Sequence, residues 1–277
     1  MPELPEVEFG RRQLEAVLVG ERLTSVAVFD DPIVFEGVSP ARVVAALEGA
    51  TVRAARRRGK HLWLELDRRP WPLFHFGMTG GFATPDGSGL QLHTGPALDA
   101  QWPPRFAKIV LETARGRALC MTNARRLGRI RLRRDPLCES PIADLGFDPL
   151  LEPPDPSDLY ARLQARRGML KGLLLDQRFA AGVGNWVADE VLHAARLDPR
   201  RKANTLGPAE AERLAEALTS ITKKAVDADA DADRYPGHWL FHQRWAPAEG
   251  LTTPAGDSIE FLTLSGRATA WVPALQK

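Results

Sequence analysis

The chain opens with MPELPEVE (residues 1–8), in which a proline follows the first methionine and three glutamates follow at short intervals. If Met1 is removed, Pro2 presents a secondary amine at the chain end. A terminal amine has a pKa near ~8, so a useful fraction is neutral and nucleophilic at physiological pH. A secondary amine that attacks a sugar aldehyde carbon gives an iminium ion, as in Schiff-base catalysis. Glu3 is near enough along the chain to move protons.

The same residues also suit the start of an α-helix. Pro5 fits the first turn, where its missing N–H costs nothing, and Glu6 and Glu8 complement the helix dipole. Four residues supply an apolar face: Val7, Leu14, Val17 and Leu18. Taken alone, the stretch is better explained as a capped helix than as a catalytic terminus, so the remainder of the chain has to decide between the two.

Length and composition predict an ordinary globular protein. The 277 residues are 44% hydrophobic and 26% charged, enough for a substantial core and two domains. There is no apolar run long enough to span a membrane and no signal-peptide core. The two cysteines, Cys120 and Cys138, make neither a disulfide framework nor a four-ligand zinc site alone. We therefore expect a soluble, intracellular protein.

The net charge of +2 is small, but its distribution is uneven. Arginines crowd residues 53–60 and 125–134, whereas much of the acid lies in the Asp-Ala repeat at 227–233. Residues 129–133 alternate arginine with Ile130 and Leu132, which predicts a half-buried strand with an exposed arginine face. A single charge run is usually a solvated face, but two such runs on strand-like segments favour a polyanionic partner.

The patterns predict an α+β chain in four segments. Period-two alternation follows the first helix, and helical patterns follow a proline-rich stretch. The segments are a leading helix with β structure (1–135), a proline-rich linker (136–156), a helical domain (157–235) and a C-terminal β-hairpin (236–277).

Six motifs, in chain order, resemble the formamidopyrimidine-DNA glycosylases and their endonuclease VIII relatives. They are PELPEVE (2–8), RGK (58–60), HFGMTG (75–80), NARRLG (123–128), GVGNW (182–186) with Asp189-Glu190, and SGRATA (265–270). Any one motif is weak, but six in order over essentially the whole chain are specific.

The resemblance implies an N-terminal β-sandwich behind the leading helix, then a helix–two-turn–helix DNA-binding domain and a finger hairpin. It implies a bifunctional enzyme of base excision repair, a DNA glycosylase with AP lyase activity that nicks the strand by β,δ-elimination. The partner would be damaged double-stranded DNA. We expect a monomer without a cofactor, located in the nucleus of a eukaryote or otherwise in the cytoplasm or nucleoid.

The resemblance also assigns catalytic roles. Pro2 would attack the anomeric carbon, and Glu3 would donate or shuttle protons. Lys60 would supply a cation near the sugar and phosphate, and Arg267 would hold the phosphate beside the lesion, which suits a planar guanidinium. Glu6 would order the site, although a role as a helix-dipole acid is about equally favoured.

A base inside a duplex is unreachable, so the family flips the nucleotide out. Met78 is the predicted wedge that fills the vacated stack, with Arg126 and Leu127 entering beside it.

Further predicted DNA contacts lie at the glycine-rich loop and near it. Glycines before a helix let backbone N–H groups approach a phosphate, which favours Asn185 as a contact. Lys171 matches a lysine of the family motif, so it is a stronger candidate for a DNA contact than Arg167 on the same segment. Lys108 lies near the place where many bacterial members carry a histidine.

The chain departs from the bacterial pattern at its end. Residues 236–277 contain no cysteine, so His238 and His242 lack thiolate companions and we expect no metal. The resemblance is to the zincless-finger branch, similar to plant and fungal members. Five aromatic residues are available to pack its hairpin: Trp239, Phe241, Trp245, Phe261 and Trp271.

Two further departures bear on the substrate. The Asp-Ala repeat replaces a longer loop that helps bacterial members recognise 8-oxoguanine, which favours formamidopyrimidines and hydantoins over 8-oxoguanine. Leu127 stands where many relatives carry phenylalanine, so recognition of the opposite base would be looser.

Two alternatives remain open. A catalytically silent damaged-DNA-binding module of the same fold would bind abasic DNA without nicking it. A basic RNA-associated protein would have no need for Pro2 and Glu3.

Overall fold

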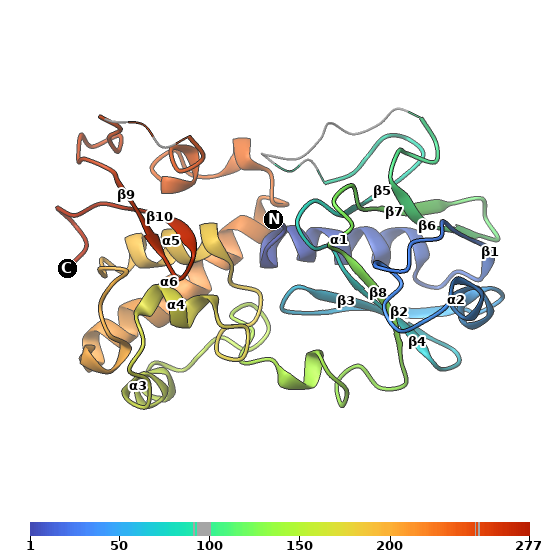
Figure 1. Cartoon of the computed structure of the whole chain (residues 1–277), viewed down its shortest axis with the longest axis horizontal. Helices are drawn as coiled ribbons and strands as arrows, with labels where there is room; N and C mark the ends of the chain where they lie inside the picture. Colours follow the sequence, from blue (N-terminus) through green and yellow to red (C-terminus); the bar gives the residue numbers. More distant parts are fainter. Residues whose placement is uncertain (91, 93–100, 247, 249) are drawn as a thin grey trace. The chain divides into compact units, whose positions relative to one another are not determined.

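The computed structural model describes residues 1–90, 92, 101–246, 248 and 250–277. The chain divides into two compact units, Met1–Asp144 and Leu145–Lys277, which run from blue to green and from yellow-green to red in Figure 1. This division falls inside the linker predicted at 136–156. The predicted helical domain and finger hairpin belong to one unit.

The first unit contains two four-stranded antiparallel sheets. One sheet has the spatial order β1 (Leu23–Val28), β6 (Ala107–Thr113), β7 (Ala118–Thr122) and β5 (Gly81–Ala83). The other has the order β2 (Val52–Arg58), β3 (His61–Leu66), β4 (Trp71–His75) and β8 (Arg129–Arg133). Their apolar side chains share one core, in which Leu62 and Phe74 join Leu111 and Met121. The predicted β-sandwich is confirmed.

The leading helix α1 (Leu4–Leu18) contacts strands of both sheets. Pro5 lies in its first turn, and Val7, Leu14 and Leu18 are buried, so the predicted apolar face exists. Gly10 is required by packing, because a Cβ there would lie 2.8 Å from the Phe76 ring. A second helix, α2 (Pro40–Leu47), begins at the N-cap Ser39.

The predicted exposed arginine face of β8 is wrong. Arg129 and Arg131 are only partly exposed, because both donate to the Glu36 carboxylate. Arg133 donates to the Ser140 carbonyl at 2.8 Å. The alternation of β8 is confirmed, but an acid from a distant loop neutralises two of its three cations.

The second unit is helical and ends in a hairpin. Its helices are α3 (Pro156–Gln164), α4 (Leu170–Leu175), α5 (Asn185–Ala194) and α6 (Pro208–Asp227). Short 3-10 helices occur at η1 (Ile142–Asp144) in the first unit and η2 (Ala203–Thr205), η3 (Ala232–Arg234) and η4 (Leu240–His242) in the second. The two turns at residues 176–184 separate α4 from α5, as in a helix–two-turn–helix element.

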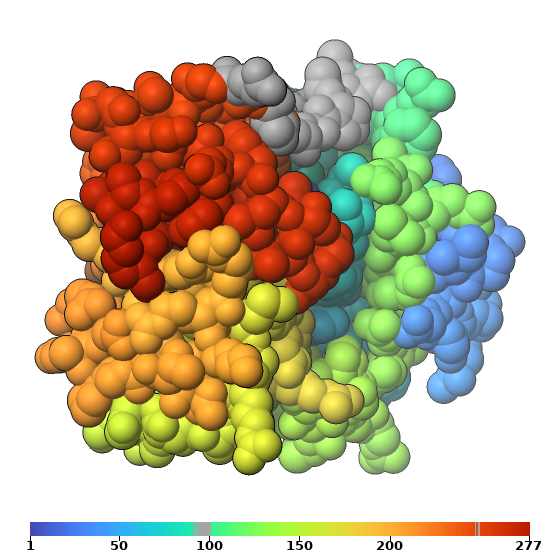
Figure 2. Space-filling model, turned by 60° about the vertical axis from the view of Figure 1, so that its left-hand side comes forward, coloured from blue at the N-terminus to red at the C-terminus, as the bar shows by residue number. Residues whose placement is uncertain are grey.

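The finger hairpin consists of β9 (Glu260–Leu264) and β10 (Arg267–Trp271). Its two-residue turn has positive φ at both Ser265 and Gly266, the geometry that matches strand twist in tight hairpins. Within this unit, β10 and η4 both contact α5, and the hairpin is the red part of Figure 2. Trp239 and Phe241 lie in the same apolar cluster as Trp186, so aromatic packing anchors the segment.

Among the residues described, no helix combines the length and apolarity needed to cross a bilayer.

Candidate functional site

The N-terminal residues predicted to be catalytic are buried at the start of α1. Pro2, Glu3 and Glu6 all lie below the surface. The Glu6 carboxylate accepts the backbone N–H of Glu3 at 2.9 Å, which holds the leader against the first helical turn. Burial, together with the nearby charge of Glu3, raises the pKa of Glu6 to about 7. Glu6 can therefore exchange a proton near neutral pH, beyond its role at the helix start.

A buried ion pair connects this helix to the hairpin that carries Lys60. Arg57 of β2 donates from Nε to the Glu8 carboxylate at 2.9 Å, and its Nη1 donates to the Gly59 carbonyl at 3.0 Å. Gly59 has φ +56°, which suits the tight turn between β2 and β3. Lys60 is buried in that turn. Arg57 thus ties α1 to the turn that carries Lys60, a role that its place in an arginine run did not reveal.

Two histidines with tilted, neighbouring rings lie next to Lys60. His61 and His75 are cross-strand partners whose ring centroids are 4.8 Å apart. Burial, and then the charge of Lys60, lowers the pKa of His75 to about 4. The neutral ring accepts the Gly77 backbone N–H at Nδ1 (3.2 Å), so His75 orients the turn that leads to Met78.

The two predicted gap-filling loops are joined by Asn123. Its side-chain amide donates to the Phe76 carbonyl at 2.7 Å and its oxygen accepts the Gly128 N–H at 3.0 Å. A Cβ on Gly77 would lie 2.4 Å from the Leu127 backbone, so only glycine allows this approach. The structure therefore brings the loop of the partly exposed Met78 against the loop of the exposed Leu127.

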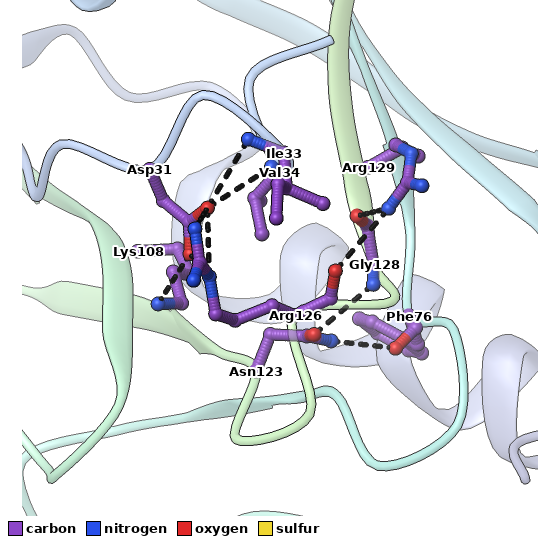
Figure 3. A network of polar contacts seen from close by, with 9 residues as sticks. All are labelled: Asp31, Ile33, Val34, Phe76, Lys108, Asn123, Arg126, Gly128 and Arg129. Atoms are coloured by element: carbon purple, nitrogen blue, oxygen red, sulfur yellow. Dashed lines mark hydrogen bonds and ion pairs between the residues drawn. The ribbon is translucent and has the colours of Figure 1, made fainter.

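Arg126 and Lys108 share one acid (Figure 3). The Asp31 carboxylate accepts bonds from Nε and Nη2 of Arg126 at 2.9 and 3.0 Å, and from Nζ of Lys108 at 2.9 Å. The two predicted DNA contacts thus lie side by side. Asp31 is 77 residues from one partner and 95 from the other, so no local pattern indicated it.

In the second unit, the glycine-rich loop and the finger hairpin meet. Asn185 begins α5 after Gly184, and its Nδ2 donates to the Ala268 carbonyl of β10 at 2.8 Å. Arg267, the neighbour of Ala268, is exposed on the first position of β10. Arg167 is exposed in the segment between α3 and α4.

The structure corrects the prediction for Lys171. Its side chain is fully buried and donates to the Asp189 carboxylate and to the Asn185 carbonyl (2.7 Å). Asp189 also accepts Arg244 at 2.7 Å and the backbone N–H of Ala270 at 3.3 Å. The Lys171 ammonium is held in the interior by its ion pair with Asp189. It therefore binds the backbone carbonyl of Asn185 and does not reach the surface.

Metal ligands are not clustered in the described part of the chain, where no group of three or more histidine, cysteine or acidic side chains could hold an ion. His238 and His242 are exposed.

Comparison with known proteins places this architecture. Residues 1–130 match the formamidopyrimidine-DNA glycosylase N-terminal domain, and residues 145–235 match the formamidopyrimidine-DNA glycosylase H2TH domain. A formamidopyrimidine-DNA glycosylase of Arabidopsis thaliana is 40% identical over all of this chain and 71% of its own length. One from Thermus thermophilus is 37% identical over all of this chain and 98% of its own.

Solved structures show the same fold. The MutM (Fpg) protein of Thermus thermophilus has a TM-score of 0.76 at 34% identity, covering 99% of this chain and 98% of its own. Lactococcus lactis formamidopyrimidine-DNA glycosylase, non-covalently bound to DNA with an AP site, has a TM-score of 0.81 at 24% identity and covers 99% of both chains. At that identity the likeness concerns the fold.

A sandwich behind a leading helix, followed by a helix–two-turn–helix unit with a finger hairpin, defines a class of DNA-repair glycosylases. The chain belongs to the formamidopyrimidine-DNA glycosylase family.

Proposed function

We propose that this protein removes oxidised bases from damaged double-stranded DNA and then nicks the strand, with the Pro2 amine as nucleophile. The observation that carries the proposal is the buried leader, where Pro2 and Glu3 lie beside Glu6, whose pKa is raised to about 7 by burial. Relatives at 40% and 37% identity are named formamidopyrimidine-DNA glycosylases, which supports the substrate class. We propose a monomer that acts in the nucleus or nucleoid.

The proposed chemistry needs one amine and one proton carrier. The amine nitrogen of Pro2 bonds to the anomeric carbon, and the bond from that carbon to the base breaks as the base leaves with a proton. The bond from the anomeric carbon to the ring oxygen then breaks, the oxygen takes a proton, and the opened sugar is held as an iminium ion. The iminium withdraws electrons, which acidifies the neighbouring sugar carbon and permits β- and then δ-elimination of the two flanking phosphates. Glu3 would transfer these protons, and Glu6 would exchange a proton with it near neutral pH.

Other residues would hold the DNA. Lys60, in the turn that Arg57 ties to α1, would place a cation at the sugar and phosphate. Asn185 and Arg267 meet through Ala268 and would bind phosphates around the lesion, while Arg167 would add a more distant contact. Met78 and Leu127 would fill the gap left by the flipped nucleotide.

The lesion range is proposed from the same residues. Formamidopyrimidines and hydantoins would be removed well and 8-oxoguanine weakly, because the Asp-Ala repeat takes the place of a recognition loop. The repeat forms a short turn after α6 and the 3-10 helix η3, and an Arg234–Asp229 ion pair at 3.0 Å connects them. A panel of duplexes with each lesion, scored for base release and for δ-elimination ends, tests this order. Equal release of 8-oxoguanine would contradict it.

The nucleophile is tested by borohydride trapping on a duplex with one abasic site. We expect a covalent adduct with the natural protein after Met1 removal, and loss of the adduct with Pro2→Gly or with an N-terminal tag left in place. Trapping that persists with a blocked N-terminus would refute the mechanism. Tight binding without any nicking would instead indicate a silent DNA-binding module, and a preference for structured RNA over abasic duplex would refute the DNA partner.

A further inference from the structure

One edge of β10 is held by side chains of α5. In an antiparallel pair, every second residue directs its backbone groups away from the neighbouring strand, and β10 pairs with β9 in a two-stranded sheet. On the other edge, the Ala268 carbonyl accepts the Asn185 Nδ2 at 2.8 Å, and the Ala270 N–H donates to Asp189 Oδ2 at 3.3 Å. Asn185 and Asp189 are one turn apart on the same face of α5. The helix therefore supplies a donor and an acceptor to a strand edge that would otherwise present unpaired backbone groups.

Asp189 also gathers two cations from other segments. Its Oδ1 accepts the ammonium of Lys171 in α4, and its Oδ2 accepts Nη2 and Nε of Arg244 at 2.7 and 3.2 Å. The side chains of Asp189 and Lys171 are fully buried, and that of Arg244 is 6% exposed. One carboxylate therefore connects α4, α5, β10 and the segment after η4.

These bonds close a ring that contains Asn185. Lys171, held by Asp189, donates from Nζ to the Asn185 backbone carbonyl at 2.7 Å. The Asn185 side chain binds the Ala268 carbonyl, and two residues further along β10 the strand bonds back to Asp189. Arg267 directly precedes Ala268 and is exposed. The ring therefore fixes the backbone of Asn185 relative to the strand that carries Arg267.

Stability alone does not account for this cluster. Replacing a buried ion pair by apolar residues of similar volume is often neutral or stabilising. Apolar contacts between a helix and a strand have no preferred direction, whereas a hydrogen bond is lost when its two groups shift past each other by more than a few tenths of an ångström. What the ionic ring adds to apolar packing is a defined register of β10 on α5.

We propose that Asp189 is a positioning residue for DNA binding, which sets the register of β10 on α5 and thereby the spacing between Asn185 and Arg267. Both side chains then meet phosphates beside the lesion as one preorganised unit, so that little ordering of the finger hairpin is needed when DNA binds. Asp189 acts through these two residues and is itself buried. The inference rests on the proposed function, which assigns phosphate binding to Asn185 and Arg267.

The test is a double-mutant cycle between Asp189 and Arg267. The probe is a duplex with a tetrahydrofuran analogue of an abasic site, which cannot be cleaved through a Schiff base, so binding is measured without catalysis. In the wild type, Arg267→Ala should weaken binding by about tenfold or more, as expected for a lost hydrogen bond to a charged group. In Asp189→Asn, which keeps an oxygen for the Ala270 N–H but removes the charge that holds the two cations, the same change should weaken binding by less than about threefold.

A second readout locates the phosphate. Phosphates beside the abasic site are replaced one at a time by neutral methylphosphonates. The wild type should lose affinity at the phosphate that Arg267 contacts, and Asp189→Asn should be insensitive at that position. A merely structural role for Asp189 would lower the folded fraction and leave this pattern unchanged.

Asp148→Asn is the matched control. Asp148 is a fully buried acid of the same unit, and its Oδ1 accepts the N–H groups of Leu150 and Leu151 at 3.0 and 3.2 Å. Whatever stability this variant loses, it should keep the full effect of Arg267→Ala and the wild-type pattern of phosphate sensitivity.

If Asp189→Asn fails to fold, Asp189→Glu keeps the charge for both cations but moves the carboxylate by one methylene. It should show the same loss of coupling to Arg267. An effect of Arg267→Ala as large as in the wild type, in whichever variant folds, would overturn the proposal, and so would an equal loss of coupling in Asp148→Asn. A wild-type protein that binds this duplex and shows the coupling but releases no base would refute the proposed function alone.

Discussion

Asn123→Ala should uncouple the two gap-filling loops. Asn123 is fully buried and makes one bond to each loop, at the Phe76 carbonyl and the Gly128 N–H. Alanine removes both hydrogen bonds and leaves a space next to Gly80. Gly80 packs closely against Asn123, because a Cβ on Gly80 would lie 2.5 Å from the Asn123 amide nitrogen. The variant therefore tests whether one side chain sets the spacing of the loops.

The magnitude follows from the two partners. The Gly128 N–H loses its acceptor in a buried place, which costs about 1–3 kcal/mol. The Phe76 carbonyl keeps a bond from the Gly80 N–H at 3.0 Å, so its loss is about 1 kcal/mol. The free energy of unfolding of the first unit should fall by about 2–4 kcal/mol, a large share of a typical domain's stability.

Urea denaturation measures the stability, and binding to abasic and undamaged duplexes measures the function. We expect the preference for abasic DNA to fall by tenfold or more, with binding to undamaged DNA nearly unchanged. Asn204→Ala is the control, because the Asn204 side chain makes no hydrogen bond to any described residue. A loss below about 0.5 kcal/mol in Asn123→Ala, or an unchanged preference, would refute the reasoning.

Three further variants have directions set by the structure. Since the pKa of Glu6 is raised from 4.5 to about 7, its contribution to stability is complete below pH 4.5 and is lost as pH rises through 7. Between pH 5 and 8, the free energy of unfolding of Glu6→Gln should therefore rise relative to that of the wild type by up to about 3 kcal/mol, as measured by urea titrations. A difference in stability that does not change with pH would contradict this. Asp189→Asn leaves two buried cations without their counter-charge and should cost about 3–5 kcal/mol. Asp198→Asn should cost less than about 1 kcal/mol, because its partner Arg200 is half exposed and water screens the pair; equal losses in thermal melts would show that the buried cluster is dispensable. Leu127→Phe adds an aromatic face at an exposed tip and should tighten binding to abasic duplex by about tenfold in fluorescence titrations, because base stacking contributes about 1–3 kcal/mol; unchanged affinity would place this tip outside the base stack.

Local chemistry made much of the fold predictable. The proline and glutamates of residues 1–8 mark a helix start, and α1 begins at Leu4. Alternation identifies β3 and β8, and Gly77 marks the turn before Met78. Pro208 is the first residue of α6, and α3 begins at Pro156 after its N-cap Asp155, so prolines mark the start of both helices.

The candidate site was predictable only as a set of motifs. Six short stretches of sequence identify its residues, but they do not identify the side chains to which those residues bond. Alternation places Trp63 on the solvent side of β3, yet it packs against Leu73 and Ile142 in a small cluster outside the main core. Periodicity identifies the two faces of a strand, and it cannot show that both faces are covered.

The sequence by itself determined the leading helix, the strands, the thiol-free finger and the residue types that carry the proposed chemistry, because these depend on neighbours within a few positions. Only the tertiary structure decided that Lys171 is buried on Asp189, that burial raises the pKa of Glu6 to about 7 and that Asp31 holds Arg126 and Lys108. Burial and ion pairing depend on which distant residue lies opposite, and chain-local patterns carry no such information. Whether a cation binds a ligand or another side chain is therefore a property of the folded chain.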